Sequence, residues 1–271
     1  MELGLRGVHV LVTGASGGIG LETTRVYLAL GANLTAHYNT QDATLKPLLA
    51  EYPDRVQAIQ ANLANESQVI DLLSNAASQG NFGPVQIAVV NHGIWPQADE
   101  PVADMSLERW NNTIAANLTS SFLVIREYLR GLKNATPQQK EKAAVVMVGS
   151  TAGKFGEAGH ADYAVTKSGM MYGLTMSLKN EIVKIAPKGR VNTVAPGWVG
   201  TPMAVEALKD PNVSYRALAT TPLKKIATPT DVANQIALLS SNLISGHVTG
   251  QVVMVEGGME GRLLNRPEDL A

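Results

Sequence analysis

The chain of 271 residues has no cysteine, few aromatic residues and almost no net charge. Without cysteine it can form no disulfide, no thiolate metal site and no catalytic thiol, a composition that fits a reducing compartment. Its formal charge of −1 argues against nucleic-acid binding, which requires a basic face. The five histidines, at positions 9, 37, 92, 160 and 247, lack the spacing of metal ligands, so no metal site is predicted.

Long apolar runs are also absent. No stretch approaches the roughly 20 apolar residues that a membrane-spanning helix needs, and the opening residues 1–6 do not have the form of a signal peptide. We therefore expect a cytoplasmic protein that binds a small molecule and neither nucleic acid nor a membrane. No long linker interrupts the chain, so residues 1–271 are predicted to form a single domain with a sizeable core.

Short β-branched and apolar runs alternate along the chain with segments whose apolar residues have helical spacing. Seven strands are predicted, near 8–13, 33–38, 55–60, 85–90, 143–149, 189–195 and 251–256. The segments between them, such as 69–77 and 118–132, are long enough for crossover helices that return the chain for parallel pairing. This alternation predicts an α/β fold in which a doubly wound, seven-stranded parallel sheet is flanked by helices.

A glycine-rich turn, Thr13-Gly-Ala-Ser-Gly-Gly-Ile-Gly20, joins the first expected strand to the first expected helix. Gly14 can take backbone angles closed to other residues, Gly18 lets the chain approach a pyrophosphate, and Gly20 allows the helix to pack tightly on the strand. The positive end of the helix then faces the phosphates. A glycine turn alone is as often an empty loop, but the flanking strand and helix favour phosphate binding.

Three side chains later in the chain indicate proton transfer. Ser150 follows the apolar run 143–149, which places its hydroxyl at the carboxyl end of a central strand, where ligands of open parallel sheets bind. Tyr163 and Lys167 are four residues apart on an expected helix over 162–186, and therefore share a face. A phenol normally titrates at about pH 10, and a neighbouring ammonium favours its ionised form. Lys167 can therefore lower the pKa of Tyr163 toward neutral pH.

In this order, the motifs resemble the short-chain dehydrogenase/reductase family over nearly the whole chain. The resemblance rests on the turn 13–20, on Ser150 thirteen residues before Tyr163, and on Tyr163-Ala-Val-Thr-Lys167. Further segments agree with it: Asn91-His-Gly93 is similar to the family's Asn-Ala-Gly motif, Asn117 to its active-site asparagine, and Pro196-Gly197 with Thr201 to its segment beside the nicotinamide. The resemblance implies a Rossmann fold and hydride transfer with a nicotinamide cofactor.

The resemblance also implies which residues hold that cofactor. They are Gly14, Ser16, Gly18, Ile19, Gly20, Tyr38, Asn39, Thr40, Asn62, Leu63, Asn91, Gly93, Tyr163, Lys167, Pro196, Gly197, Val199 and Thr201. Asn62 stands where the family usually has aspartate, and its amide can still pair with the adenine edge.

The choice of cofactor depends on the end of the second strand. Members of the family that prefer NAD have an aspartate there, which holds the ribose hydroxyls and repels a 2′-phosphate; here Tyr38 takes that place. We therefore expect NADP, with His37, Asn39 and Thr40 available to donate hydrogen bonds to a phosphate. NAD is the alternative, because Gly17 and Asn39 stand where many NADP-binding members have a basic residue.

Four residues are expected to be catalytic by resemblance. Ser150 would donate a hydrogen bond to a carbonyl oxygen and Tyr163 would deliver the proton. Lys167 would bind the nicotinamide ribose and keep the phenol acidic, and Asn117 would hold a water that links Lys167 to solvent. The expected reaction is the reversible reduction of a carbonyl compound, such as a 3-oxoacyl thioester or a small ketone.

Other functions are less favoured. The main alternative is an NAD-dependent alcohol dehydrogenase that works in the oxidative direction. A non-catalytic nucleotide sensor would have lost Ser150, Tyr163 or Lys167, and a cofactor-free lyase or dehalogenase would lack the glycine turn and the lysine. All of these features are present.

The substrate pocket is expected beside the segment 198–223, which by resemblance closes over the substrate. Its candidate walls are Trp95, His160, Trp198 and Met203. Trp95, Trp198 and Met203 can equally be core, and His160 is expected at the surface. His92 replaces the family's alanine and is expected either to reach the pocket or to pack under its own loop.

Two features remain at the periphery. Residues 133–142 are polar and contain a proline, which predicts a solvated loop. Residues 257–271 follow the last strand and can frame the pocket or a neighbouring subunit, but a frayed tail is the simpler expectation.

The resemblance also implies an oligomer. Relatives pair helices such as those expected at 106–132 and 162–186, so a homodimer or homotetramer is predicted.

Overall fold

A computed structural model describes residues 2–265 of the chain and contains one sheet of seven parallel strands in the order β3-β2-β1-β4-β5-β6-β7. The strands are β1 (His9–Val12), β2 (Asn33–Tyr38), β3 (Val56–Gln60), β4 (Ile87–Val90), β5 (Ala144–Val148), β6 (Arg190–Pro196) and β7 (Val252–Val255). The predicted fold class is confirmed, and each predicted strand end lies within two residues of the observed one.

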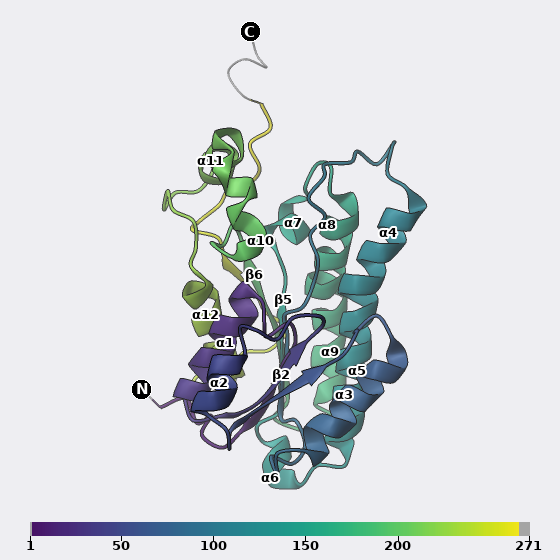
Figure 1. Cartoon of the computed structure of the whole chain (residues 1–271), viewed down its shortest axis with the longest axis vertical. Helices are drawn as coiled ribbons and strands as arrows, with labels where there is room; N and C mark the ends of the chain where they lie inside the picture. Colours follow the sequence, from purple (N-terminus) through teal and green to yellow (C-terminus); the bar gives the residue numbers. More distant parts are fainter. Residues whose placement is uncertain (1, 266–271) are drawn as a thin grey trace.

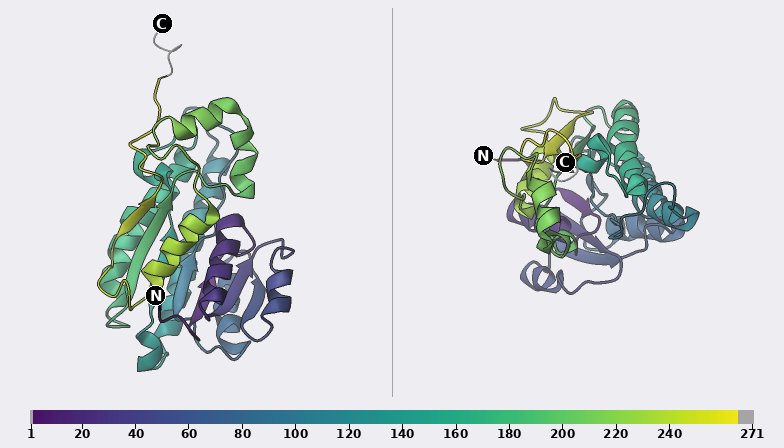
Figure 2. Two further views of the ribbon diagram at one scale, coloured as in Figure 1. Left: turned by 90° about the vertical axis from the view of Figure 1, so that its left-hand side faces the viewer. Right: turned by 90° about the horizontal axis from the view of Figure 1, so that it is seen from above.

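Helices cover both faces of the sheet, so the molecule has three layers (Figures 1 and 2). On one face lie α1 (Gly18–Ala29), α2 (Lys46–Glu51) and α12 (Pro229–Ser240), and on the other α3 (Glu66–Ser78), α5 (Ser120–Lys133) and α9 (Thr175–Ile182). Side chains alternate along each strand, so Val10 and Val12 pack under the first group and Leu11 under the second. Burial of both faces explains why the central strands are almost entirely apolar.

Two long helices that border the site each contain a π-helical turn. The first runs through α4 (Leu107–Thr113), η1 (Ile114–Thr119) and α5, and the second through α8 (Ala161–Ser168), η2 (Gly169–Leu174) and α9. The predicted helices over 118–132 and 162–186 are thus present, although the second ends at Ile182. Such turns are frequent at functional sites, and Asn117 lies in the first of them.

The order of the strands places a crevice beside β1. The chain runs outward from β1 to β2 and β3, and then returns to the opposite side of β1 with β4. Loops that leave the carboxyl ends of β1 and β4 therefore diverge, and ligands of open α/β sheets bind at this switch point.

The remaining connections carry short helices. The predicted loop 133–142 contains α6 (Pro137–Lys140), which begins with a capping box between Thr136 and Gln139. α7 (Thr151–Phe155) follows β5, and the segment 198–223 forms α10 (Pro202–Val205), η3 (Ala207–Lys209) and α11 (Pro211–Leu218). Within residues 2–265, no helix has the length and hydropathy needed to cross a bilayer.

The segment after β7 is held against α11 and its following turn. Thr220 Oγ1 donates to the carbonyl oxygen of Gly261 at 2.7 Å, and the Glu260 N–H donates to the carbonyl oxygen of Thr220 at 3.2 Å. The prediction of a frayed tail is therefore wrong for residues 257–262, because hydrogen bonds that the sequence pattern does not reveal hold them. Residues 266–271 lie outside the described residues.

Candidate active site

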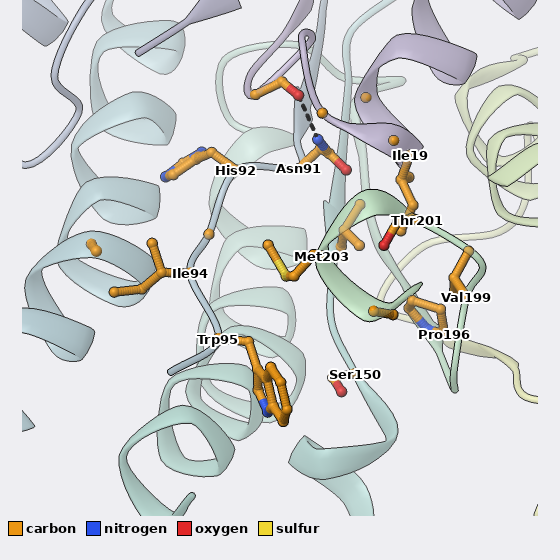
Figure 3. A pocket seen from close by; sticks show the side chains of 18 of the residues that line it. Ile19, Asn91, His92, Ile94, Trp95, Ser150, Pro196, Val199, Thr201 and Met203 are labelled. Carbon is orange, nitrogen blue, oxygen red and sulfur yellow. Dashed lines mark hydrogen bonds between the residues drawn. The ribbon is translucent and has the colours of Figure 1, made fainter. Parts of the chain in front are cut away.

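A cavity of about 660 Å³ lies along the carboxyl ends of the central strands. All the predicted site residues border it except Tyr38, Asn117 and His160. Figure 3 shows Ile19 and Asn91 at one end of this cavity and Trp95 and Ser150 toward the other. The cavity thus brings the glycine turn and the predicted catalytic side chains into one continuous space.

The glycine turn is packed so closely that it has no room for side chains. Gly14 has a φ of +64°, which disfavours other residues, and a β-carbon on Gly20 would overlap the carbonyl oxygen of Gly14. A β-carbon on Gly18 would lie 2.7 Å from Cγ2 of Thr201, so Gly18 also makes room for the segment after β6. Since α1 begins at Gly18 without a side-chain cap, the N–H groups of its first turn are available to an anion.

The loop after β4 is fastened to this turn. Asn91 Nδ2 donates to the carbonyl oxygens of Thr13 at 3.0 Å and Gly14 at 3.2 Å. The His92 ring lies between the hydroxyls of Thr13 and Ser120, each 2.8 Å from a ring nitrogen. Burial lowers the pKa of His92 well below its ordinary value, so the ring is neutral. Both ring nitrogens of His92 thus have partners, as expected for packing beneath the loop, and His92 also borders the cavity.

Asn117 lies beneath the same loop and is fully buried. Its Oδ1 accepts a hydrogen bond from the Ile94 N–H at 2.8 Å, and its Nδ2 donates to the Ile94 carbonyl oxygen at 2.9 Å. The amide therefore fixes the position of the residues that precede Trp95. Its predicted role as the holder of a water molecule stays a prediction.

Ser150, Tyr163 and Lys167 meet beside the end of β5. Ser150 is the N-cap of α7, where its Oγ accepts a hydrogen bond from the Ala152 N–H at 3.1 Å. Lys167 Nζ donates to the carbonyl oxygen of Val148 at 2.8 Å and lies 5.7 Å from the centroid of the Tyr163 ring. The i, i+4 spacing on α8 thus directs both side chains to the cavity.

Burial shifts the pKa values of this pair in opposite directions. It raises the pKa of Tyr163 to about 12, a rise that a hydrogen bond with Ser150 opposes. It lowers the pKa of Lys167 to about 8. The predicted lowering of the phenol's pKa by Lys167 is not found: loss of hydration outweighs the hydrogen bond of Ser150 and the charge of Arg262, which oppose the rise. At neutral pH, Tyr163 therefore keeps its proton and most Lys167 side chains are charged.

The far end of the cavity is bordered by Asn39, Thr40 and Asn62. Tyr38 is absent from this wall, because alternation along β2 turns its ring toward the core under α1 and α2. His37 faces the cavity, but its Nδ1 accepts from the Gly14 N–H at 3.0 Å and its Nε2 then donates to the Ala61 carbonyl at 2.9 Å. The prediction that His37 donates to a phosphate is therefore wrong: burial lowers its pKa to about 4, and its one N–H is already engaged.

Aromatic rings form the wall near Ser150. Trp95 makes an edge-to-face contact with Trp198, with ring centroids 6.1 Å apart. Met203 lies between this end of the cavity and the end at Ile19 (Figure 3). His160 stacks on Trp95 at 4.8 Å and its Nε2 lies 2.7 Å from the carbonyl oxygen of Pro96. Its side chain is buried, so the expectation of a surface position is wrong; it supports Trp95 from behind.

Sequence reasoning missed two charged residues that border the cavity, Glu157 and Arg262. Glu157 precedes α8 and Arg262 follows β7, with Nη2 of the arginine 3.5 Å from Oε2 of the glutamate. Neither belongs to a motif with recognisable spacing. Only the folded chain brings them together.

Comparisons with known proteins agree with this arrangement. Residues 14–260 match the family described as enoyl-(acyl carrier protein) reductase. The chain is 34% identical over 255 residues to nodulation protein G of Rhizobium sp. (strain N33), covering 94% of this chain and 98% of that protein. It is 33% identical over 258 residues to the 3-oxoacyl-(acyl-carrier-protein) reductase FabG of Vibrio cholerae, covering 95% and 99%.

Solved structures resemble it over the same extent. A short-chain dehydrogenase/reductase from Brucella melitensis, described as a glucose/ribitol dehydrogenase, has a TM-score of 0.83 and 32% sequence identity. The match covers 96% of this chain and 99% of that one.

Proposed function

This chain belongs to the short-chain dehydrogenase/reductase family, and on that premise we propose that it reduces a carbonyl compound to an alcohol with NADPH, in a reversible reaction. The observation that carries the proposal is the position of Ser150, Tyr163 and Lys167 in one cavity with the glycine turn. The three side chains provide acid catalysis and the glycine turn provides an anion site. Hydride transfer from a dinucleotide needs both.

The cavity fits a dinucleotide cofactor. The uncapped start of α1 and the space above Gly18 and Gly20 suit a pyrophosphate. Asn39 and Thr40 would bind the adenosine ribose, Asn62 the adenine, and Lys167 the nicotinamide ribose. The reduced nicotinamide, when bound, supplies the hydride.

The proposal favours NADP over NAD. Among the cavity-lining residues of the described chain, the one carboxylate is Glu157, which lies near Tyr163 rather than at the ribose end. A 2′-phosphate therefore meets amide and hydroxyl donors without a repelling charge. NAD remains the alternative, since no lysine or arginine borders the ribose end either.

The chain's own groups account for the proton transfer. The Ser150 hydroxyl donates a hydrogen bond to the carbonyl oxygen, where negative charge develops. Tyr163, which is protonated at neutral pH because its pKa is about 12, gives its phenolic proton to the same oxygen. The phenolate that remains is stabilised by Ser150 and by the nearby positive charge of Lys167.

Two kinds of substrate are proposed within this reaction. The similarity to FabG of Vibrio cholerae supports a 3-oxoacyl thioester, and the aromatic wall of Trp95 and Trp198 suits a small ketone equally well. Oxidation of an alcohol with NAD is the alternative, supported by the structural similarity to the Brucella melitensis dehydrogenase. A sensor without activity is disfavoured, because the catalytic side chains are intact.

The test is a turnover screen of NADPH and NADH against aldehydes, ketones, quinones and 3-oxoacyl thioesters, followed by the loss of cofactor absorbance. We expect turnover with at least one carbonyl class, and faster turnover with NADPH. The Tyr163→Phe variant should lose turnover by at least about 100-fold while it keeps its affinity for NADPH, because only the proton donor is removed. Wild-type turnover in that variant would contradict the proposal.

A further inference from the structure

The charged residues of the cavity are few and unevenly accessible. Within residues 2–265, Lys167 and Arg262 are the two basic residues that border it, and Glu157 is the one acidic residue. Lys167 is buried and donates to the carbonyl oxygen of Val148. The Arg262 side chain is 24% exposed, so it is the cation that a substrate can reach.

The guanidinium of Arg262 is only partly engaged. Its Nε donates to the carbonyl oxygen of Gly156 at 3.3 Å, and its Nη2 lies 3.5 Å from Glu157, a distance longer than that of a good charged hydrogen bond. No residue of the described chain accepts a hydrogen bond from its Nη1. One edge of the planar group therefore contacts the loop before α8, while donors at its other end remain available.

The position of Arg262 is set by the fold. Hydrogen bonds of Gly261 and Glu260 with Thr220 hold the segment that carries it. Arg262 lies close enough to Tyr163 to oppose the rise in the pKa of the phenol. Among the described residues that line the cavity, the other cation is Lys167, which is buried and engaged with the carbonyl oxygen of Val148.

We propose that Arg262 is a substrate-binding residue that holds a carboxylate of the substrate, so that the preferred substrates are oxo acids rather than neutral ketones. A carboxylate can take two parallel hydrogen bonds from the free end of the guanidinium and displace the long contact with Glu157. This inference rests on the proposed function and narrows its substrate class. Glu157 repels the same carboxylate and keeps the preference moderate.

The test compares acids with their neutral esters. Wild-type protein and the Arg262→Gln variant are assayed with NADPH against 3-oxobutanoate, 4-oxopentanoate and 5-oxohexanoate and against the three methyl esters. We expect the wild type to prefer at least one acid over its ester. In Arg262→Gln, KM for that acid should rise by about 10- to 150-fold, the value of a hydrogen bond to a charged group, with little change in kcat or in ester turnover.

Two variants provide controls. Arg262→Lys keeps the charge without the planar fork and should recover part of the preference. Glu157→Gln removes the neighbouring negative charge and should keep or increase the preference for the acid. Loss of acid preference in Glu157→Gln as complete as in Arg262→Gln would show that the pair is structural, and would overturn the inference.

Other outcomes separate the inference from the proposed function. If the wild type reduces esters or 3-oxoacyl thioesters as well as acids, or if Arg262→Gln slows acid and ester equally, the inference is overturned while carbonyl reduction stands. If no carbonyl compound is reduced, the proposed function fails. Binding of 4-oxopentanoate, followed by tryptophan fluorescence, then tests Arg262 alone: equal affinity in wild type and Arg262→Gln overturns the inference, and weaker binding in the variant supports it.

Discussion

At the scale of single residues, one physical cause sets the protonation of the candidate catalytic pair. Burial raises the pKa of Tyr163 to about 12 and lowers that of Lys167 to about 8, because it disfavours the charged form of each group. A phenol that keeps its proton is suited to the reductive direction. The cation beside it is the group that titrates close to neutral pH.

We therefore expect reductive turnover to fall as the pH rises through about 8, the pKa of Lys167. Tyr163 remains protonated there, but loss of the Lys167 charge removes stabilisation from the phenolate that forms after proton transfer. The measurement is the pH profile of kcat/KM with NADPH, with Lys167→Met as the control that should lack this decline. A wild-type profile that stays level until about pH 10, the ordinary range of a phenol, would contradict the role of Lys167.

Asn39 provides a test of cofactor preference, because it borders the cavity while the adjacent Tyr38 does not. Asn39→Asp should lower kcat/KM for NADPH by about tenfold or more and affect NADH less, since a carboxylate repels a 2′-phosphate. Steady-state kinetics with both cofactors measures the change. Tyr38→Phe, which leaves the cavity wall unaltered, should keep the wild-type preference. Equal losses with both cofactors in Asn39→Asp would argue against NADP.

At the scale of secondary structure elements, the π turn η1 positions Asn117 so that it holds the loop after β4. The single amide of Asn117 pairs with both the N–H and the carbonyl oxygen of Ile94. The loop after β4 carries Trp95 and borders the cavity, so its position depends on the helix that follows it in the chain.

Asn117→Ala should lower the free energy of unfolding by about 1–3 kcal/mol, because it removes the two hydrogen bonds that the buried Asn117 amide makes with the backbone of Ile94. Urea denaturation measures this change. Asn117→Asp keeps the acceptor but loses the donor and buries a carboxylate beside the Ile94 carbonyl oxygen, so it should also be less stable than the wild type. An unchanged stability in Asn117→Ala would show that the loop does not depend on this contact.

At the scale of the whole molecule, one side of the structure carries exposed apolar side chains. They lie on the helical layer of α4, α5, α8, α9 and the intervening turn η2 (Figure 1), and include Leu107, Phe122, Val165 and Tyr172. The sequence analysis predicts that these same helices pair between subunits. Burial of such side chains between subunits is favourable, so a homodimer or homotetramer stays our prediction.

Light scattering of the purified protein should give the mass of a dimer or tetramer. Tyr172→Glu should shift the mass toward smaller species, because it would bury a charge in an apolar contact. Tyr215→Glu alters an equally exposed aromatic residue on α11 and should leave the mass unchanged. A monomeric wild type would contradict the prediction.

The sequence by itself was sufficient to predict the architecture and the meeting of Ser150, Tyr163 and Lys167 at one cavity. Alternation of apolar runs predicted each strand, because the periodicity of burial is a local property of the chain. The spacing from Ser150 to Tyr163 and Lys167 is also local, since a strand end and one helix position all three. Such short-range patterns can be recognised in the sequence without knowledge of how the elements pack.

Only the tertiary structure decided which other side chains reach the cavity. Neighbouring residues of β2 point to opposite faces of the sheet, so His37 borders the cavity and Tyr38 does not. A strand pattern alone does not reveal which face borders the cavity. Arg262 contacts the backbone of Gly156, 106 positions away, because the return of β7 and the closing segment bring the two loops together. Contacts between distant loops depend on how all the layers pack, and no local pattern in the sequence records them.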